Sequence, residues 1–283
     1  MTSEASGTAE SPLESMPPPA LHRSSNLSIE ASLLRVRIVL VGTSHPGNVG
    51  AAARAMKVMG MARLALVAPR HANIAARAEA RALASGATDV LDGATMHATL
   101  DDALSNVAWS VAMTARDREF APPRLSLTDA AAKAAGFTAA HGPLEIAFVF
   151  GSERYGLASD DVLRCQASCA IETSGVYSSL NLAQAVQLVA YECRCAALEN
   201  AAKRPNVGAA SQGESFALAT HEEREALIAH LEEALVAIGY LDPASPKKLM
   251  PRLRRFLARA GLEREEAQWL RGIAKAILRQ ARR

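Results

Sequence analysis

The sequence predicts an α/β protein that contains a parallel sheet, followed by a small helical domain. Apolar segments of strand length, such as 35–42, 63–67 and 146–150, alternate with helical patterns, which is typical of a parallel α/β sheet. A stretch rich in Gly, Ser, Pro and Asn then precedes amphipathic helical patterns. We therefore expect four parts: a leader at 1–33, a sheet domain at 34–200, a linker at 201–216 and a helical domain at 217–283.

Proline and glycine mark the ends of the first expected helix. Pro46 suits a first helical turn and Gly60 suits the residue after the last turn. Apolar segments predict strands at 35–42, 63–67, near Val90, and at 109–113, 146–150 and 169–171. Helical patterns lie between them at 46–59, 73–84, 99–105, 126–135, 158–165 and 181–200. In the C-terminal part they cover 220–238, 246–260 and 263–280.

Composition and charge indicate an ordinary globular protein. The 283 residues are 49% hydrophobic, with a formal net charge of +2 and no apolar run of the roughly 18 residues that a membrane span needs. Residues 1–33 are rich in Ser, Pro, Glu and Ala, lack a secretory signal and predict disorder. The cysteines at 165, 169, 193 and 195 lie in apolar segments without the CxxC spacing of structural zinc sites. We expect reduced thiols, no metal and a cytoplasmic protein.

The turn after the first strand, Gly42–Gly50, has the GxxxxG spacing of half a phosphate-binding loop. Asn48 stands where a nucleotide-binding loop needs lysine, and no GxGxxG follows, which argues against nucleotide hydrolysis and a dinucleotide-dependent oxidoreductase. Backbone N–H groups of such a turn still suit an anion. Asn48 is either a helix N-cap or a site residue. Arg54 and Lys57 share a helix face that is either solvated or substrate-facing.

Two further loops follow strands and are rich in small, hydrogen-bonding residues. One is Gly151–Gly156, with the sequence GSERYG, and the other is Tyr177–Asn181, with the sequence YSSLN. The carboxyl ends of parallel strands meet at one edge of a sheet, so we expect a ligand site where these loops meet. Ser179 is either the N-cap of the helix at 181–200 or a site residue.

The C-terminal segment carries two basic runs. Residues 247–259 hold six Lys and Arg without an acid, and residues 271–283 hold five more. Either run alone is equally well explained as a solvated helix face, but two in one segment favour a phosphate-binding surface. Aromatic residues make up only 4% of the chain, so we expect phosphate contacts and shape, rather than base stacking, to dominate nucleic-acid recognition.

Four segments occur in the order GTSHPGNVGAAARAMK, MTARDR, FGSERYGL and YSSLNLAQAVQLVAYE. They resemble the successive motifs of the SPOUT methyltransferases, and among these the TrmJ type of tRNA 2′-O-methyltransferase. The match covers about 35–199, and LMPRLRRFLARAGLEREEAQWLRGIAKAIL resembles the C-terminal helices of the same type. The resemblance implies a sheet with a deep C-terminal trefoil knot and S-adenosylmethionine as cofactor. It also implies methylation of cytidine or uridine at position 32 of the tRNA anticodon loop, by a homodimer whose subunits complete each other's cofactor sites.

The resemblance also assigns roles to individual residues. The cofactor would be bound by Met113, Thr114, Ala115, Gly151, Ser152, Glu153, Ile171, Ser178, Ser179 and Leu180. Catalysis or substrate orientation would fall to Asn48, Arg54, Arg118, Ser179 and Asn181. The tRNA would contact Arg116, Lys247, Lys248, Arg252, Arg254 and Arg255.

Some of these roles depend on details of single residues. An arginine pKa above about 12 makes free guanidine rare, so we interpret Arg54 as orienting the 2′-OH and a neighbouring phosphate rather than as a base. Ser152 stands where TrmJ-type sequences often carry arginine, a departure that concerns RNA affinity more than the cofactor site. The apolar helix face at 181–198 suits either a dimer interface or burial within its own domain. Alternative functions are a sibling SPOUT enzyme acting on another tRNA or rRNA position and a non-catalytic knotted RNA-binding protein.

Overall fold

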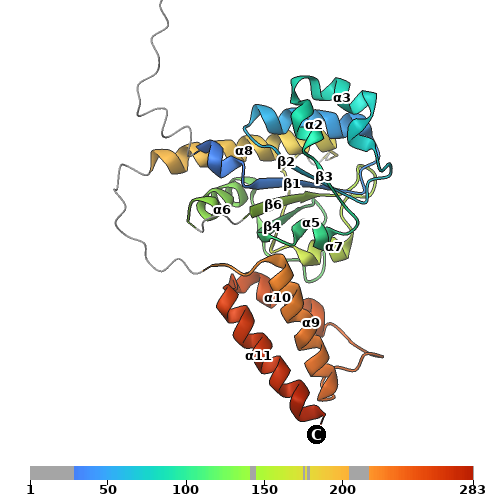
Figure 1. Cartoon of the computed structure of the whole chain (residues 1–283), viewed down its shortest axis with the longest axis vertical. Helices are drawn as coiled ribbons and strands as arrows, with labels where there is room; N and C mark the ends of the chain where they lie inside the picture. The colour runs from blue at the N-terminus through green and yellow to red at the C-terminus, as the bar shows by residue number, and fades with distance from the viewer. Residues whose placement is uncertain (1–28, 141–144, 175, 177–178, 204–216, 283) are drawn as a thin grey trace, which may run out of the picture.

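A seven-stranded parallel sheet forms the centre of the larger domain (Figure 1). The computed structural model describes residues 29–140, 145–174, 176, 179–203 and 217–282, and every structural statement below concerns these residues. The strands follow the spatial order β3-β2-β1-β6-β4-β7-β5. They are β1 (Val36–Val41), β2 (Arg63–Val67), β3 (Thr95–His97), β4 (Val107–Met113), β5 (Arg124–Leu125), β6 (Glu145–Phe150) and β7 (Ala167–Cys169).

Helices connect the strands and continue into a separate C-terminal group. In the sheet domain they are α2 (Pro46–Val58), α3 (Ala78–Ala84), α4 (Thr88–Asp92), α5 (Leu100–Leu104), α6 (Leu127–Ala140), α7 (Ser159–Arg164) and α8 (Leu182–Ala202). Two short 3₁₀ turns are η1 (Ile74–Ala76) and η2 (Ser85–Ala87). The C-terminal domain consists of α9 (His221–Ala237), α10 (Leu249–Ala260) and α11 (Arg264–Ala281). None of the helices in the described part of the chain is long and apolar enough to span a membrane.

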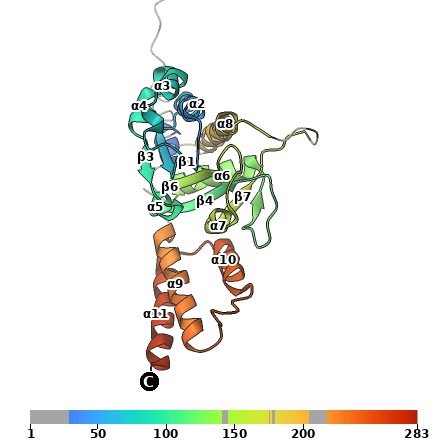
Figure 2. The same cartoon turned by 90° about the vertical axis from the view of Figure 1, so that its right-hand side faces the viewer.

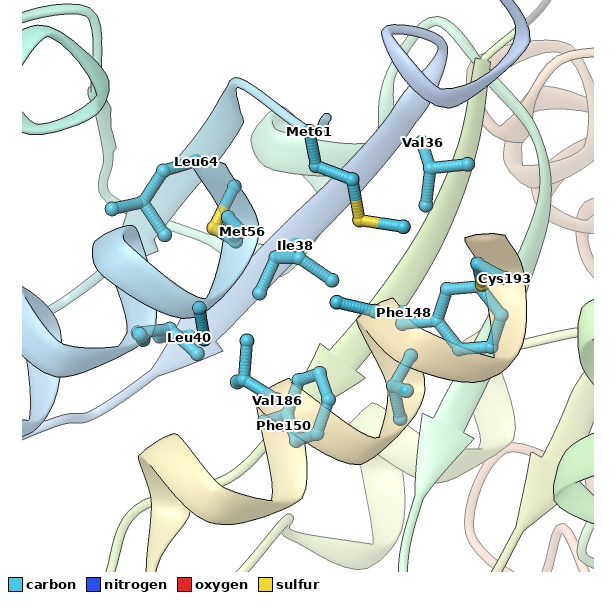
Figure 3. Packing of buried hydrophobic residues seen from close by; sticks show 14 of the residues in the cluster. Val36, Ile38, Leu40, Met56, Met61, Leu64, Phe148, Phe150, Val186 and Cys193 are labelled. Carbon is cyan, nitrogen blue, oxygen red and sulfur yellow. The ribbon is translucent and has the colours of Figure 1, made fainter. Parts of the chain in front are cut away.

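The sheet is buried on both faces because successive side chains of a strand point in opposite directions. Phe148 of β6 faces the core shared with α2, α6 and α8, whereas its neighbour Val149 faces α5 and α7. Figure 3 shows part of the first of these cores, to which Ile38 of β1, Phe148 of β6 and Val186 of α8 all belong. The near-continuous apolar composition of β6 is therefore what a central parallel strand requires.

Strand order places several loops at one edge of the sheet. From β1 the chain runs outward through β2 and β3, then crosses to β4, and β6 later pairs with both β1 and β4. In open parallel sheets the ligand crevice lies at the carboxyl ends of the strands beside such a change of direction. The segments that follow β1, β4, β6 and β7 begin at Gly42, Thr114, Gly151 and Ala170. The deep trefoil knot stays a prediction.

The predicted fold class is confirmed, but three local predictions were wrong. Val90 lies in α4 rather than in a strand, because a short apolar run does not distinguish a strand from a helical turn packed on α2. The strand expected at 169–171 is β7, two residues earlier. Residues 29–33 are helical rather than part of a disordered leader, since Ile29 and Leu33 are buried in the main core.

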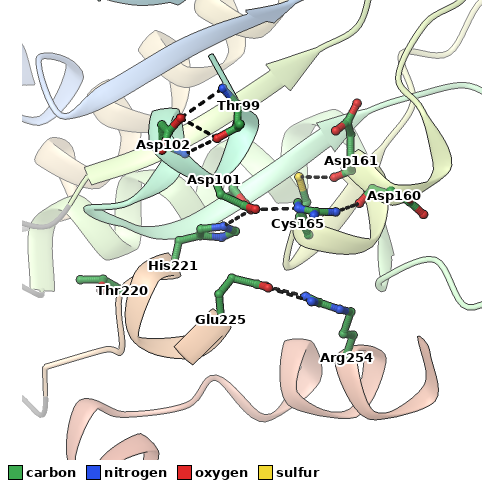
Figure 4. Close-up of polar contacts among 12 residues, drawn as sticks. Thr99, Asp101, Asp102, Asp160, Asp161, Cys165, Thr220, His221, Glu225 and Arg254 are labelled. Atoms are coloured by element: carbon green, nitrogen blue, oxygen red, sulfur yellow. Dashed lines mark hydrogen bonds and ion pairs between the residues drawn. The ribbon is translucent and has the colours of Figure 1, made fainter. Parts of the chain in front are cut away.

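The C-terminal domain docks beneath the face of the sheet that α5 and α7 cover (Figures 1 and 2). Buried His221 donates from Nε2 to the Asp101 carboxylate at 2.8 Å, and Arg164 Nε lies 2.9 Å from the same oxygen (Figure 4). The His221 hydrogen bond is the main reason that the pKa of Asp101 is lowered to about 2; the Arg164 charge also lowers it, although partial burial acts in the opposite direction. Buried Arg224 donates to the Ala108 carbonyl at 2.8 Å. Polar contacts thus join the two domains.

We expect the contact between Asp101 and His221 to contribute measurably to the free energy of unfolding of the full chain. Replacing Asp101 with Asn should lower the free energy of unfolding by about 1–2 kcal/mol at pH 6, because buried His221 and Arg164 lose their shared charged acceptor. Urea unfolding of the full chain measures the change. Glu232→Gln, on an exposed part of α9, is the control. Equal free energies of unfolding for Asp101→Asn and the unaltered chain would show that this contact does not stabilise the protein.

Candidate active site

A cavity of about 280 Å³ opens where β4, β6 and β7 end. Its volume lies just below the range of about 300–1,000 Å³ that is usual for small-molecule sites. The walls come from three parts of the chain that are distant in the sequence. Two are the segments 113–118 and 150–157, and the third contributes Cys169, Ile171, Ser179, Leu180, Leu182 and Ala185. Polar and apolar groups both line it, which is usual for a small-molecule site.

The structure brings the predicted cofactor residues together around this cavity. Those that line it are Met113, Thr114, Ala115, Gly151, Ser152, Glu153, Ile171, Ser179 and Leu180. Ser178 lies outside the described residues. Arg116 and Arg118 also line the cavity. Sequence reasoning missed the apolar part of the wall, which includes Phe150, Leu157, Cys169, Leu182 and Ala185. Their positions were the signal, since Cys169 ends β7 and the other four lie within the recognised motifs FGSERYGL and YSSLNLAQAVQLVAYE.

The loop after β6 is a tight turn that requires glycine at its start. A Cβ atom on Gly151 would lie 2.0 Å from the carbonyl carbon of Gly156 and 2.1 Å from the nitrogen of Leu157. The Gly156 N–H donates to the Ser152 carbonyl at 2.8 Å, which closes the loop on itself. Glycine is therefore needed at position 151 because the backbone of Gly156 and Leu157 leaves no room for a Cβ atom, whether or not a ligand is bound.

Glu153 is the centre of the hydrogen-bond network beside the cavity. Its carboxylate accepts from the Thr43 hydroxyl at 2.8 Å, the Ser44 N–H at 3.2 Å and the Asn48 amide at 3.0 Å. The Ser44 hydroxyl and the His45 N–H add contacts of 3.3 Å each. The anion expected at the turn before α2 is therefore the protein's own carboxylate, held at a helix N-terminus.

This network keeps Glu153 ionised. Partial burial acts to raise the pKa of Glu153, but hydrogen bonds from Asn48, Thr43 and Ser44 outweigh it and lower that pKa to about 2. A carboxylate with such a low pKa is a poor acceptor for a proton at neutral pH. The contacts of Glu153 therefore suit a carboxylate that holds these donors in place better than one that accepts a proton as a general base.

Two asparagines extend the network to the loop before α8. Asn181 donates from Nδ2 to Asn48 Oδ1 at 2.9 Å, and its own Oδ1 accepts from the Ala183 N–H at 2.9 Å. Asn181 is therefore the N-cap of α8, and the alternative that Ser179 caps this helix was wrong. The N-cap alternative for Asn48 was also wrong. Pro46 already occupies the first turn of α2, so His45 holds the cap position.

Arg118 and Arg54 occupy different settings. Arg118 donates to the Thr114 hydroxyl at 2.7 Å and to the Leu157 carbonyl at 2.5 Å, which ties the loop after β4 to the loop after β6. Arg54 is exposed on α2 and is not among the residues that line the cavity. Lys57, one turn further along the same helix, makes an exposed ion pair with Asp89 at 2.8 Å.

The basic residues of α10 divide into two groups. Arg254 makes a two-pronged ion pair with Glu225 of α9, with distances of 2.5 and 2.7 Å, which assigns it a structural contact inside the domain (Figure 4). Lys248, Arg252, Arg255 and Arg259 are exposed at spacings of four, three and four residues and therefore share one helix face. Arg259 belongs to the basic run at 247–259 but was not among the predicted tRNA contacts. Lys247 is exposed just before this helix.

The cysteines of the chain are free thiols. Burial raises the pKa of Cys165 to about 12 and that of Cys169 to about 11, so both are neutral at physiological pH. Within the described residues, no group of His, Cys, Asp and Glu has the arrangement needed to hold a metal ion.

Comparisons with known proteins agree over nearly the whole chain. The model of the SpoU rRNA Methylase family matches residues 35–191, and that of the tRNA methyltransferase TrmJ C-terminal domain matches residues 222–283. A Pseudomonas aeruginosa protein named tRNA (cytidine/uridine/adenosine-2′-O-)-methyltransferase TrmJ is 42% identical over 254 residues, covering 88% of this chain and 95% of its own. The crystal structure of TrmJ from Z. mobilis ZM4 is 32% identical and superposes with a TM-score of 0.71, covering 85% of this chain and 98% of its own.

A third similar protein is a probable methyltransferase from Bordetella pertussis, whose crystal structure is 45% identical and has a TM-score of 0.57. The match covers 59% of this chain and 99% of that protein.

The low pKa of Glu153 predicts how stability depends on pH. The carboxylate contributes its full stabilisation above its ordinary pKa of 4.5, and this is lost as the pH falls from there towards 2. Glu153→Gln should be less stable at neutral pH and should lack this part of the acid destabilisation. Thermal unfolding of both proteins between pH 2 and pH 7 measures the difference. Parallel curves for the two proteins over that interval would contradict the assignment.

Proposed function

The chain belongs to the TrmJ family of RNA ribose methyltransferases, and we propose that it methylates the 2′-OH of cytidine or uridine at position 32 of the tRNA anticodon loop, with S-adenosylmethionine as donor. The observation that carries the proposal is the cavity at the ends of β4, β6 and β7, because the described residues predicted to bind the cofactor line it. The names of the tRNA-modifying relatives support the substrate class.

The residues around the cavity suit S-adenosylmethionine. The apolar side chains of Phe150, Ile171 and Leu180 would hold the adenine, and main-chain groups at the strand ends would read its polar edge. The cationic side chains of Arg116 and Arg118 suit the carboxylate of the methionine part. When bound, the cofactor supplies an electrophilic methyl group on its sulfonium.

The protein's share of this reaction is mainly positioning. Methyl transfer is an in-line displacement, so holding the ribose hydroxyl against the methyl group supplies most of what side chains contribute. Glu153 is held by its donors as a carboxylate, and Arg118 is engaged within the cavity wall. Arg54 would orient the hydroxyl and a neighbouring phosphate, while the proton leaves late to water. Ser179, which is exposed and lines the cavity, would contact the cofactor or the ribose.

A homodimer would account for the position of Arg54. It lies outside the cavity of its own chain, and a second subunit would present its Arg54 to this cavity. Helix α8 offers an apolar surface for such a contact, since Leu188, Tyr191 and Leu198 are 39%, 52% and 44% exposed. Their spacings of three and seven residues place them on one face of the helix.

The tRNA would lie along the exposed face of α10 formed by Lys248, Arg252, Arg255 and Arg259. Arg116 and Lys247 are also exposed and cationic, and would add contacts to phosphates. Such binding should weaken steeply with salt, because each phosphate contact releases counterions. We expect the protein to work in the cytoplasm, where its tRNA substrate is found.

Mapping the methylated nucleotide tests the proposal directly. Incubation with tRNA and labelled S-adenosylmethionine should place one 2′-O-methyl group at position 32 on cytidine or uridine, while a tRNA already methylated there should accept none. Methylation of adenosine would widen the substrate class, and methylation elsewhere would identify a sibling enzyme. RNA binding without cofactor binding in calorimetry would identify a non-catalytic RNA-binding protein.

Substitution of Arg54 tests its orienting role. Arg54→Ala should lower kcat/KM roughly 100-fold, because misplacement of the hydroxyl costs about that much. Calorimetric affinity for S-adenosylmethionine should stay unchanged. Arg77→Ala, at an exposed position outside the cavity, is the control. A normal rate for Arg54→Ala would show that Arg54 neither orients nor deprotonates the hydroxyl.

A further inference from the structure

Phe120 adopts a backbone conformation that a bulky side chain rarely takes. Its φ of +61° lies in the left-handed region, within a turn in which the Ala121 N–H donates to the Arg118 carbonyl at 3.2 Å. Glycine or asparagine usually fills such a position. A strained phenylalanine persists only where its surroundings hold it, and such residues gather at functional sites.

Two cations of the C-terminal domain hold the Phe120 ring. Lys248 Nζ lies 5.4 Å and Arg252 Cζ 5.5 Å from the ring centroid, which is the distance range of cation–π contacts. The two residues are four positions apart at the start of α10, so both side chains reach the same ring. Glu119 adds an ion pair to Lys248.

The same loop forms part of the cavity wall. Thr114, Ala115, Arg116 and Arg118 line the cavity, and Arg118 ties this end of the loop to Leu157. Phe120 is two residues beyond Arg118, at the end of the loop that touches α10. The segment from Thr114 to Phe120 is therefore fastened at the cavity by Arg118 and at the C-terminal domain by Phe120.

We propose that Phe120 is a positioning residue through which α10 holds the cavity-lining loop in its binding conformation. The cation–π contacts of Lys248 and Arg252 with the ring increase the fraction of molecules in which the loop has its binding conformation. The apparent affinity of the cavity for its ligand rises with that fraction. The identity of the ligand, S-adenosylmethionine, rests on the proposed function. Because coupling between two sites is reciprocal, tRNA on α10 and the methyl donor in the cavity influence each other through this contact.

Separate contacts dock the domain, so the role of Phe120 can be tested by itself. His221 and Arg224 join the C-terminal domain to Asp101 and Ala108, on the side of the sheet that carries α5. None of these residues contacts Phe120 among the described interactions. Loss of the ring should therefore release the loop and leave the domains joined.

Three substitutions separate the ring from the backbone strain. Phe120→Gly removes the ring and relieves the strain, Phe120→Leu keeps apolar bulk without a π face, and Phe120→Trp keeps a π face. We expect Phe120→Gly and Phe120→Leu to bind S-adenosylmethionine roughly 5- to 20-fold more weakly in calorimetry on the full chain without tRNA. Phe120→Trp should bind it nearly as well as the unaltered chain does.

Substitutions on α10 supply matched controls. Arg252→Met should reproduce the loss of donor affinity, because it removes one cation from the ring. Arg255 lies on the same face of α10, but the cations that contact the Phe120 ring among the described residues are Lys248 and Arg252. Arg255→Met should therefore weaken tRNA binding and leave donor affinity unchanged. Equal losses of donor affinity in both variants would indicate a general effect of charge and overturn the proposal.

Hydrogen exchange tests the contact without any ligand. Amides of residues 114–121 should exchange faster in Phe120→Gly than in the unaltered chain, while those of α9 and β4 should not change. Equal exchange would overturn the proposal, as would equal donor affinity in Phe120→Gly and the unaltered chain. If the unaltered chain binds no S-adenosylmethionine, the proposed function fails, and the exchange measurement still decides the role of Phe120.

Discussion

The carboxylate of Glu153 at the start of α2 is the interaction on which the site depends. This partly buried carboxylate loses some of its bound water, and hydrogen bonds from Thr43, Ser44 and Asn48 compensate for the loss. Asn48 then holds Asn181, which caps α8. One charge thereby connects the loops after β1 and β6 with the start of α8. Removing it would leave several donors without an acceptor, so the network favours a single arrangement.

The sheet supplies the frame in which this network forms. Because β6 pairs with both β1 and β4, three strand ends from distant parts of the chain meet at one edge. Burial on both faces keeps these strands rigid, and rigid strand ends give loops a defined starting direction. The C-terminal domain contacts this frame through His221 and Arg224, and its residues Lys248 and Arg252 contact the ring of Phe120. The cavity wall thus depends on both domains.

Much of the cavity could be predicted from motifs, because small and polar residues after apolar strands are needed wherever backbone lines a ligand site. Residues whose roles depend on partners were harder to predict. Both Asn48 and Ser179 were candidates for helix N-caps. In the structure His45 holds the N-cap position of α2 and Asn181 that of α8, because the first turn of each helix begins at the following residue. Local composition does not contain that information, since Ser and Asn suit caps, turns and sites alike.

Sequence alone determined the parallel α/β class, the following helical domain and the segments that meet at the cavity, because period and turn chemistry are local properties. Tertiary structure decided what each polar group touches. Arg254 turns to Glu225, whereas Arg259, in the same basic run, stays exposed, and Glu153 rather than a bound anion occupies the start of α2. Hydrogen bonds and ion pairs join residues far apart in the chain, so their partners emerge only when the sheet brings those residues together.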